Sequence, residues 1–297
     1  MPGLSVPFTK GHGTENDFVV IEDPDGRYDL SPAQVAAICD RRAGIGADGV
    51  LRVVRGRQVP AWAERWQGDP DLWFMDYRNA DGSVSEMCGN GVRVFVRYLL
   101  ERGLATGPEV PVGTRDGLKP TTVLPDGRIR VQMGPSRVLG RDVEVQAELH
   151  DHPPMVWTGW RVDVGNPHAV SLLAASEADR LDQLDLGRAP LWRPADAFPA
   201  GVNLEFVRVT GDRQIAMRVF ERGSGETRSC GTGTCAAAAA TAAARNLAHG
   251  GADGPVTFVV DVPGGSVEVE LDGDRTALTG PAVLVAHGEF VLPDGTV

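Results

Sequence analysis

The chain has 297 residues, a hydrophobic content of 42% and a formal net charge of -11. A chain of this length holds one large domain or two ordinary domains, each able to bury a core. The acidic balance argues against nucleic acid as a main partner, because phosphate binding needs a basic face. No run of about eighteen apolar residues occurs, which argues against a membrane partner. With no basic-then-apolar leader either, we expect a cytoplasmic protein.

Cysteine and lysine usage narrows the chemistry. The cysteines are too few for a disulfide scaffold, so in a reducing compartment we expect thiols at Cys39, Cys88, Cys230 and Cys235. Lysine occurs only at Lys10 and Lys119, and neither has the setting of a Schiff-base lysine. A pyridoxal phosphate cofactor is therefore not expected.

The first predicted elements are a strand and a short helix. The segment Phe8 to Asp23, FTKGHGTENDFVVIED, has a glycine-rich turn and then the apolar run Phe18 to Ile21, typical of a buried strand. Ser31 and Pro32 have the pattern of an N-cap and a first helical residue. Cys39 lies on the apolar face of this helix, so we interpret it as a core residue.

A glycine-broken turn and a polar loop come next. The segment Arg41 to Val54, RRAGIGADGVLRVV, feeds a strand, and its glycines lack the strand-to-helix context of a dinucleotide site. The polar, proline-bearing segment Arg55 to Leu72 is predicted to be an exposed loop inserted in a β-hairpin. Its tryptophans would cover part of the core or meet a partner.

Two helices are the clearest elements of the chain, and each is followed by a hairpin. The helix after Cys88 is apolar nearly all round, which predicts a central, buried position. The Ala-rich helix after Cys230 is expected to end near Gly250. The hairpins are Pro120 to Met133, turning at Asp126-Gly127, and Val256 to Leu271, turning at Pro263-Gly264-Gly265.

These landmarks repeat along the chain. Met75 precedes Cys88 by thirteen positions, as Met217 precedes Cys230, and each cysteine is followed by Gly, a small polar residue and Gly. The Met-Gly-Pro and Thr-Gly-Pro sequences after the hairpins add a third pair, at offsets of about 140 to 150 residues. We infer an internal duplication of one α+β unit. The expected domains are 1–133, completed by a returning strand in 281–297, and 134–280, with a hinge near Gly134.

The paired cysteines predict acid/base chemistry. A helix start carries unpaired N–H groups and the positive end of the helix dipole, which lower a thiol's pKa and bind anions such as a carboxylate. Two such starts facing each other could hold one α-carboxylate with a thiol on either side of the adjacent carbon. A racemase or epimerase needs this arrangement, with a base on one face and an acid on the other.

Other candidates are weaker. Cys235 lies within the Ala-rich helix and is interpreted as a packing residue, and His12 as a loop residue. The short cluster of His150, Asp151 and His152 could suggest a metal site. Its spacing does not supply a third ligand that converges on one point, so no metal site is predicted.

The motifs GHGTENDF, GIGADGV, NADGSVSEMCGNG, GNPHAV, VNLEFV and ERGSGETRSCGTGTCA are spread over essentially the whole chain. Together they resemble the diaminopimelate epimerase family, whose members need no cofactor. The resemblance implies two pseudo-symmetric α+β domains, each a curled, mostly antiparallel sheet around a central helix, with the active site in the cleft between them. It also implies a homodimer that interconverts LL- and meso-2,6-diaminopimelate for lysine and peptidoglycan precursor synthesis.

The resemblance carries roles to single residues. It implies that Cys88 and Cys230 are the acid/base pair and that His168 and Glu221 help take the thiol proton. Amides of the two helix starts would cradle the α-carboxylate, from Gly89, Asn90, Gly231 and Thr232. The remaining substrate-binding residues would be Asn16, Asn79, Asn166, Asn203, Glu221 and Arg222, whose amide and guanidinium groups suit a doubly zwitterionic amino acid. The family's usual GLGNDF reads GTENDF here, which makes Glu15 a departure.

Several alternatives stay open at this stage. His168 could be a turn histidine bonded to backbone, and Glu221 with Arg222 a solvated pair at a strand end. At the level of function, the rivals are a proline racemase-like relative, a thiol-redox protein and a non-catalytic amino-acid binding module. The absence of a Cys-x-x-Cys pair argues against the redox protein.

Overall fold

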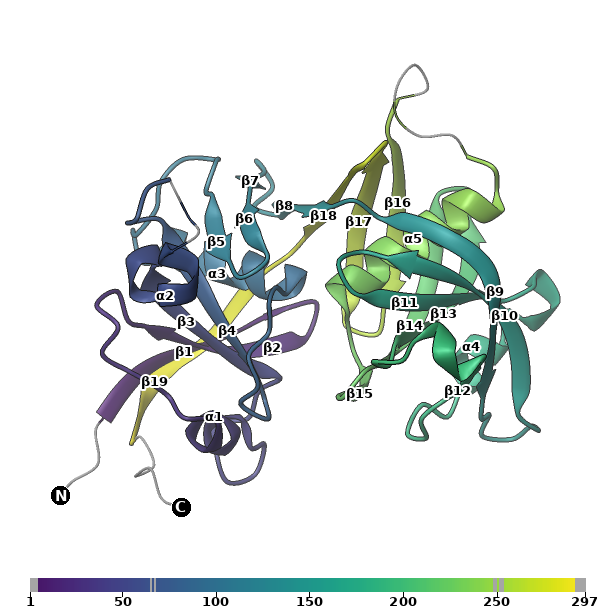
Figure 1. Cartoon of the computed structure of the whole chain (residues 1–297), viewed down its shortest axis with the longest axis horizontal. Coiled ribbons are helices and arrows are strands. Elements are labelled where there is room, and N and C mark those ends of the chain that lie inside the picture. The colour runs from purple at the N-terminus through teal and green to yellow at the C-terminus, as the bar shows by residue number, and fades with distance from the viewer. Residues whose placement is uncertain (1–4, 65, 67, 248–249, 251–253, 292–297) are drawn as a thin grey trace. The chain divides into compact units, whose positions relative to one another are not determined.

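The computed structural model describes residues 5–64, 66, 68–247, 250 and 254–291 (Figure 1). The chain divides into two compact units, the first Met1–Val131 with Pro281–Val297 and the second Gln132–Gly280. This division falls two residues before the boundary expected after Met133. Residues 292–297, part of the segment expected to return to the first unit, lie outside the described residues.

The first unit is built on one mixed sheet. Its strands are β19 (Val283–Val291), β1 (Ser5–Gly13), β2 (Asn16–Glu22), β3 (Gly49–Arg55), β4 (Trp73–Asn79), β5 (Val112–Thr114) and β6 (Gly117–Lys119), in that order across the sheet. The β2–β3 and β4–β5 pairs are parallel, and the others are antiparallel. Helix α3 (Gly89–Glu101) connects β4 to β5, and α1 (Pro32–Cys39) connects β2 to β3.

The second unit repeats this plan. The strand order is β12 (Leu191–Arg193), β9 (Arg137–Ala147), β10 (Met155–Asp163), β11 (Pro167–Leu172), β13 (Asn203–Gly211), β14 (Gln214–Glu221), β16 (Val256–Val262), β17 (Gly265–Asp272) and β18 (Arg275–Gly280). The parallel pairs are β11–β13 and β14–β16. Strand β15 (Gly225–Thr227) pairs with β14, and α5 (Gly231–Ala244) leads to β16. The expected duplication is therefore present in the strand pairing itself.

Shorter elements fill the connections. The hairpin β7 (Thr121–Val123) and β8 (Ile129–Gly134) carries the chain from the first unit to the second, and turns through Gly127 as predicted. The hairpin β16–β17 also turns where predicted. The remaining helical segments are η1 (Gly56–Gln58), α2 (Pro60–Ala63), η2 (Ala175–Glu177), α4 (Arg180–Gln183) and η3 (Ala195–Ala197).

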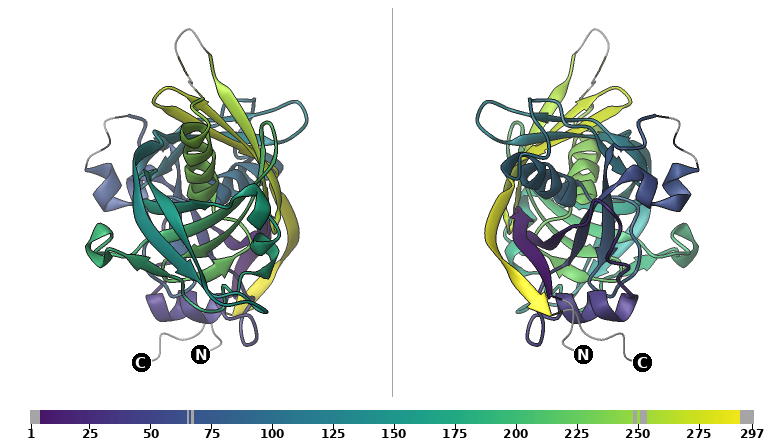
Figure 2. Two further views of the ribbon diagram at one scale, coloured as in Figure 1. Left: turned by 90° about the vertical axis from the view of Figure 1, so that its right-hand side faces the viewer. Right: turned by 90° about the vertical axis from the view of Figure 1, so that its left-hand side faces the viewer.

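Each long helix lies inside the curve of the sheet of its own unit. Helix α3 contacts strands from β19 to β4, and α5 contacts strands from β9 to β18 (Figure 2). Its enclosure explains the sequence of α3, where Val92, Val94 and Phe95 are fully buried although they point in different directions. In α5 the same enclosure is filled by alanines, whose small side chains let the strands approach closely.

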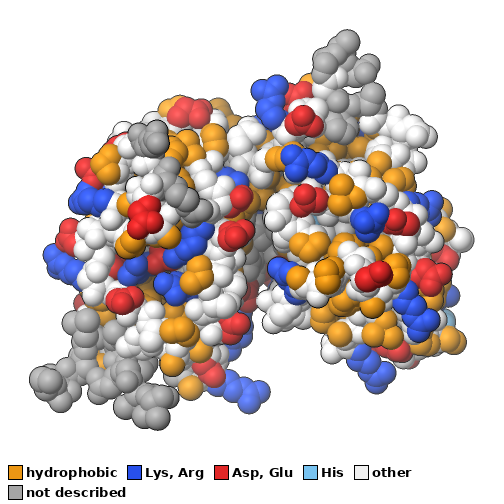
Figure 3. All heavy atoms as spheres, viewed as in Figure 1, with side chains coloured by type: hydrophobic (Ala, Val, Ile, Leu, Met, Phe, Trp, Pro, Cys, Tyr) orange, Lys and Arg blue, Asp and Glu red, His pale blue; other side chains and the backbone are white. Residues whose placement is uncertain are grey.

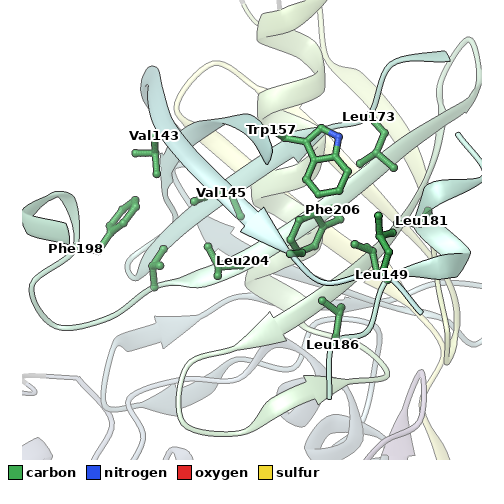
Figure 4. Packing of buried hydrophobic residues seen from close by; sticks show 14 residues of the cluster. Val143, Val145, Leu149, Trp157, Leu173, Leu181, Leu186, Phe198, Leu204 and Phe206 are labelled. Atoms are coloured by element: carbon green, nitrogen blue, oxygen red, sulfur yellow. The ribbon is translucent and has the colours of Figure 1, made fainter. Parts of the chain in front are cut away.

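The second unit has a large apolar cluster outside its helix. Trp157 packs edge-to-face on Phe206 with ring centroids 5.5 Å apart, and Leu149, Leu181 and Leu204 surround them (Figure 4). In the first unit, α1 buries Val35, Ile38 and Cys39 against β2 and β3. Cys39 is 4% exposed, which confirms the core interpretation of this residue.

Two expectations need correction. The segment Arg55 to Leu72 is inserted in the β3–β4 hairpin, but it is not simply exposed: it forms η1 and α2, and Trp62 packs with Val54 and Phe74. Helix α5 ends at Ala244 rather than near Gly250. Asn246 takes a left-handed conformation (φ 51°), and the N–H groups of Asn246 and Leu247 bond back to the last turn. Asn246 thus takes the left-handed position that ends the helix, before the expected end near Gly250.

Acidic and basic side chains alternate over the face in view (Figure 3). Among the residues that the structure describes, no helix has the length and apolar character needed to span a membrane.

The turn between β1 and β2 is strained. Both central residues have positive φ, 51° at Thr14 and 60° at Glu15, a geometry that glycine and asparagine favour. The strain lies directly before Asn16, where the sequence departs from the family's usual motif. The buried hydroxyl of Thr14 accepts from Arg93 Nη2 at 3.2 Å, which ties the turn to α3.

We predict that Glu15→Gly stabilises the protein relative to Glu15→Ala. Glycine removes the penalty of the left-handed conformation, and the net gain after its larger unfolded-state entropy is about 0.5 to 1 kcal/mol. The alanine variant is the control, since it removes the exposed carboxylate and keeps the strain. Urea unfolding of both variants measures the difference, and equal stabilities would show that the turn is unstrained.

Candidate functional site

Cys88 and Cys230 occupy the same position in the two units. Each is the N-cap of its long helix, Cys88 of α3 and Cys230 of α5. Each sulfur accepts a hydrogen bond from the backbone N–H three residues on, Gly91 N to Cys88 Sγ at 3.4 Å and Gly233 N to Cys230 Sγ at 3.4 Å. The prediction that both cysteines stand at helix starts is confirmed.

Cys88 lies among amide side chains. Asn16 Oδ1 accepts from Cys88 Sγ at 3.6 Å and from Asn90 Nδ2 at 3.2 Å. Asn90 Oδ1 in turn accepts from the buried guanidinium of Arg93 at 2.7 Å. The Cys88 thiol thus donates to an amide oxygen, while its sulfur accepts from the Gly91 N–H.

Asp48 fixes the direction in which the Asn16 amide points. Asn16 Nδ2 donates to Asp48 Oδ2 at 2.7 Å, so Oδ1 must turn toward Cys88. Burial raises the pKa of Asp48, and the Asn16 bond works against that rise. Asp48 lies in the motif GIGADGV but is not among the predicted site residues. The sequence feature that could have identified Asp48 is its position directly before a buried strand.

Asp48 is part of a cluster of ion pairs. Arg41 bonds both Asp17 (2.7 Å) and Asp48 (2.7 Å), and Lys10 bonds Asp17 at 2.6 Å. Burial works to raise the pKa of Asp17, but bonds from Arg41 and Lys10 prevail and hold it at about 2. The β2 start and the loop before β3 are thereby locked together at Asn16.

Cys230 lies among ionisable groups and is more deeply buried, with 5% of its surface exposed. Its sulfur contacts Thr232 Oγ1 at 3.5 Å, and Glu221, which accepts from Thr227, is close enough for its charge to act on the Cys230 thiol. Burial, and then the charges of Glu221 and Glu205, raise the pKa of Cys230 well above its usual value.

The expectation of a lowered pKa is therefore wrong for Cys230 as the structure places it. A helix start stabilises an anion by about 0.3 to 2 kcal/mol. Removing an ion from water costs several kcal/mol. The larger effect prevails, and Cys230 is a thiol at neutral pH. Burial likewise raises the pKa of Glu221, although the bonds from Thr227 and Cys230 oppose the rise.

His168 forms a buried pair with Glu205. Both side chains are completely buried, and Nδ1 of the ring lies 2.6 Å from Glu205 Oε1. Nε2 lies 2.9 Å from Asn166 Oδ1, and Asn166 Nδ2 donates to Thr232 Oγ1 at 3.4 Å. The reading of His168 as a turn histidine bonded to backbone is excluded. Glu205 was missed, because it stands inside the apolar run VNLEFV.

The other candidate residues are placed less directly. Asn203 Oδ1 accepts from Arg222 N at 2.9 Å, which sets the β13 and β14 ends side by side. The exposed Arg222 guanidinium donates to Ala200 O, and Asn79 Nδ2 donates to Ser83 Oγ. These contacts keep both side chains close to their own strands. The four helix-start residues Gly89, Asn90, Gly231 and Thr232 are in the first turns, where N–H groups have no partner within the helix.

No residue set for a metal emerges. Within the described ranges, no group of three or more His, Cys, Asp or Glu side chains could hold a metal ion. All four cysteines are free thiols.

Solved structures with this fold include epimerases. The model superposes on a hydroxyproline epimerase from Agrobacterium vitis with a TM-score of 0.67 and 17% identity, covering 98% of this chain and 94% of that one. It superposes on a PhzF-family phenazine biosynthesis protein of Bacillus anthracis with a TM-score of 0.66 and 15% identity, covering 97% and 99%. At these identities the likeness defines the fold, a two-domain α+β architecture that racemase-like enzymes share.

Sequence comparison is more specific. The family model for diaminopimelate epimerase matches residues 8–139 and 160–285. A diaminopimelate epimerase of Rhodococcus opacus (strain B4) is 52% identical over 292 residues, covering 95% of this chain and 96% of the relative. One of Streptomyces coelicolor is 50% identical over 286 residues, covering 96% and 95%. The chain belongs to the diaminopimelate epimerase family, and the resemblance seen in its motifs is confirmed.

We predict that iodoacetamide labels Cys88 before Cys230 at pH 7. Cys88 is half-buried, whereas Cys230 is buried and its raised pKa leaves little thiolate. The rate at Cys230 should keep rising as the pH approaches its raised pKa. Peptide mass spectrometry measures each site. Cys39, whose pKa burial raises to about 12, is the internal control that should stay unlabelled. Labelling of Cys230 as fast as Cys88 at pH 7 would contradict the assignment.

We predict that Gly233→Ala destabilises the protein more than Gly91→Ala. A Cβ at 233 would lie 2.9 Å from Glu205 Oε1, so it would push the carboxylate off His168. A Cβ at 91 would lie 3.3 Å from the Leu51 methyl, which can move, and at ordinary contact distance from Cys88. Loss of a bond to a charged group costs about 1.5 to 3 kcal/mol, against about 1 kcal/mol or less at 91. Urea unfolding compares the two, and equal losses would show that Glu205 tolerates displacement.

Proposed function

We propose that this protein is a cofactor-independent epimerase that interconverts LL- and meso-2,6-diaminopimelate. One observation carries the proposal. In a chain of the diaminopimelate epimerase family, both units present a cysteine as the N-cap of a long helix, with matched bonds from Gly91 and Gly233. The Cys88 thiol lies among amide side chains and the Cys230 thiol among carboxyl groups, a difference in surroundings that supports different roles for the two sulfurs in a two-base reaction.

In the proposed reaction, one cysteine starts as a thiolate and the other as a thiol. The thiolate removes the proton from the α-carbon, and the thiol on the opposite face returns a different proton to that carbon. The stereocentre inverts, and the two sulfurs exchange protonation states with no net gain or loss of protons. The reverse direction starts from the exchanged state, so the enzyme can turn over either isomer.

Binding and proton transfer divide among the remaining residues. The first-turn N–H groups of Gly89, Asn90, Gly231 and Thr232 would hold the α-carboxylate and stabilise the negative charge that develops beside it. Glu221, beside the Cys230 thiol, would take and return its proton, and His168, protonated on both ring nitrogens, would first give a proton and then take it back. The distal ammonium and carboxylate would be bound by Asn16, Asn79, Asn166, Asn203, Glu221 and Arg222.

The setting of the reaction is also a proposal. We propose that the two compact units are the two epimerase halves, that the enzyme is a cytoplasmic homodimer, and that its product serves lysine and peptidoglycan precursor synthesis. No metal or organic cofactor enters the scheme, since the acid and the base are both side chains. A redox function would instead need Cys88 and Cys230 to cycle through a disulfide, and a binding module would need neither thiol.

We predict that the reduced protein in deuterated water exchanges the α-hydrogen of LL- and meso-diaminopimelate. Cys88→Ala or Cys230→Ala should lower epimerisation by at least about a thousandfold, because each removes the only acid or base on one face. Proton NMR of the α-position measures exchange, and proline is the control substrate. Full epimerisation by either variant would contradict the two-base proposal. Turnover of proline but not of diaminopimelate would show that the enzyme acts on another substrate.

A further inference from the structure

The duplicated fold offers an internal comparison at the buried pair. Strand β2 lies parallel to β3 with Phe18 opposite Gly49, and β11 lies parallel to β13 with His168 opposite Asn203. Asn16 and Asn166 each come two residues before the first member of these pairs. Two residues beyond Gly49 and Asn203 are Leu51 and Glu205.

A second contact supports the same equivalence. Leu51 is the side chain nearest to a Cβ at Gly91, and Glu205 is the nearest to a Cβ at Gly233. Both glycines occupy the third position of their helix. The pair Phe18 and Leu51 in the first unit therefore corresponds to His168 and Glu205 in the second.

The two equivalent pairs show which side chains the fold accepts at this buried position. Phe18 and Leu51 are completely buried, as are His168 and Glu205. Hydrocarbon side chains thus satisfy the position in one unit. A buried ion pair is no more stabilising than an apolar pair of similar volume, and often less so. Packing alone gives no reason for the polar pair in the second unit.

The contacts of the pair locate its protons. Nε2 of His168 faces the amide oxygen of Asn166, which cannot donate, so Nε2 carries a proton. Nδ1 faces Glu205 Oε1 at 2.6 Å, a distance that requires a second proton between them. The pair therefore holds one shared proton and is neutral as a unit. Glu205 Oε2 is buried with no hydrogen-bond partner among the described residues, so His168 is the carboxyl group's one side-chain partner there.

We propose that Glu205 is a positioning residue for the epimerisation, fixing the ring orientation and the tautomer of His168 and keeping a second proton at its Nδ1 edge. The proposal rests on the proposed function, in which His168 exchanges protons during turnover. Glu205 does not touch the substrate in this scheme. Three titratable groups lie around the ring, namely Glu205 on β13, Glu221 on β14 and Cys230 at the start of α5. Burial raises the pKa of Glu205, which favours sharing of the proton over a separated charge pair.

The first test is the kinetics of Glu205→Gln in the full-length enzyme. Glutamine keeps the volume and removes the counter-ion, so we expect kcat to fall by about ten- to a hundredfold with KM changed less than about threefold. Without the carboxylate the protonated ring loses its counter-ion, so the alkaline limb of the kcat profile should move to lower pH. Ser171→Ala is the control. It removes a buried hydroxyl from β11, the strand that carries His168, and should keep full activity and the wild-type pH profile.

A double-mutant cycle separates positioning from general damage. If Glu205 acts through His168, Glu205→Gln should cause almost no further loss of kcat when it is introduced into the His168→Gln variant. The paired change of His168→Phe with Glu205→Leu copies the first unit, and should keep or raise the unfolding temperature while activity is lost. Additive losses in the cycle would overturn the proposal.

Nitrogen-15 NMR of histidine-labelled wild-type protein gives a readout that needs no turnover. His168 should show two protonated ring nitrogens across neutral pH, with the Nδ1 proton far downfield and slow to exchange. Glu205→Gln should abolish that signal. A freely titrating His168 in the wild type, or unchanged kcat and pH profile in the variant, would overturn the proposal even if the variant folds poorly. An inactive wild type with the expected His168 signal would instead count against the proposed function.

Discussion

The site depends on a sulfur atom that caps a helix. In both units the chain leaves a strand, turns through a cysteine in extended conformation, and starts a helix whose third N–H points at the sulfur. The curled sheet encloses that helix, so the position of the sulfur is set by the whole unit rather than by a loop. Gly91 and Gly233 follow from this constraint, since each must let another side chain approach the first turn.

The two units share this geometry and differ in what surrounds it. Cys88 meets the neutral amides of Asn16 and Asn90, with the ionised cluster of Asp17 and Arg41 one layer behind. Cys230 meets Thr232 and the carboxyl of Glu221, with the His168–Glu205 pair close by. Duplication provides two cysteines in matched positions, and divergence provides ionisable groups around one of them. The carboxyl groups that could accept a proton from Cys230 also raise its pKa, so burial and function are coupled there.

Much of this was predictable because the signals are local. The helix starts, the hairpin turns and the repeated Met-to-Cys spacing depend on neighbours in sequence, and the structure has them where expected. The features that could not be predicted depend on tertiary surroundings. Glu205 stands in a strand buried on both faces, where no alternation marks a carboxylate that points inward. The pKa of Cys230 depends on enclosure, which no motif encodes. Asn246 ends α5 because an αL cap does not require glycine.

The central claim is that two separate groups handle the proton on opposite faces of one carbon. The most direct measurement starts from LL-diaminopimelate in deuterated water and follows isotope content at the start of the reaction, before product accumulates. The account predicts deuterium at the α-carbon of the meso product and almost none in the remaining LL substrate, because each thiol returns its own proton to its own face. Equal deuterium in substrate and product would mean that a single group serves both faces, and would contradict the account.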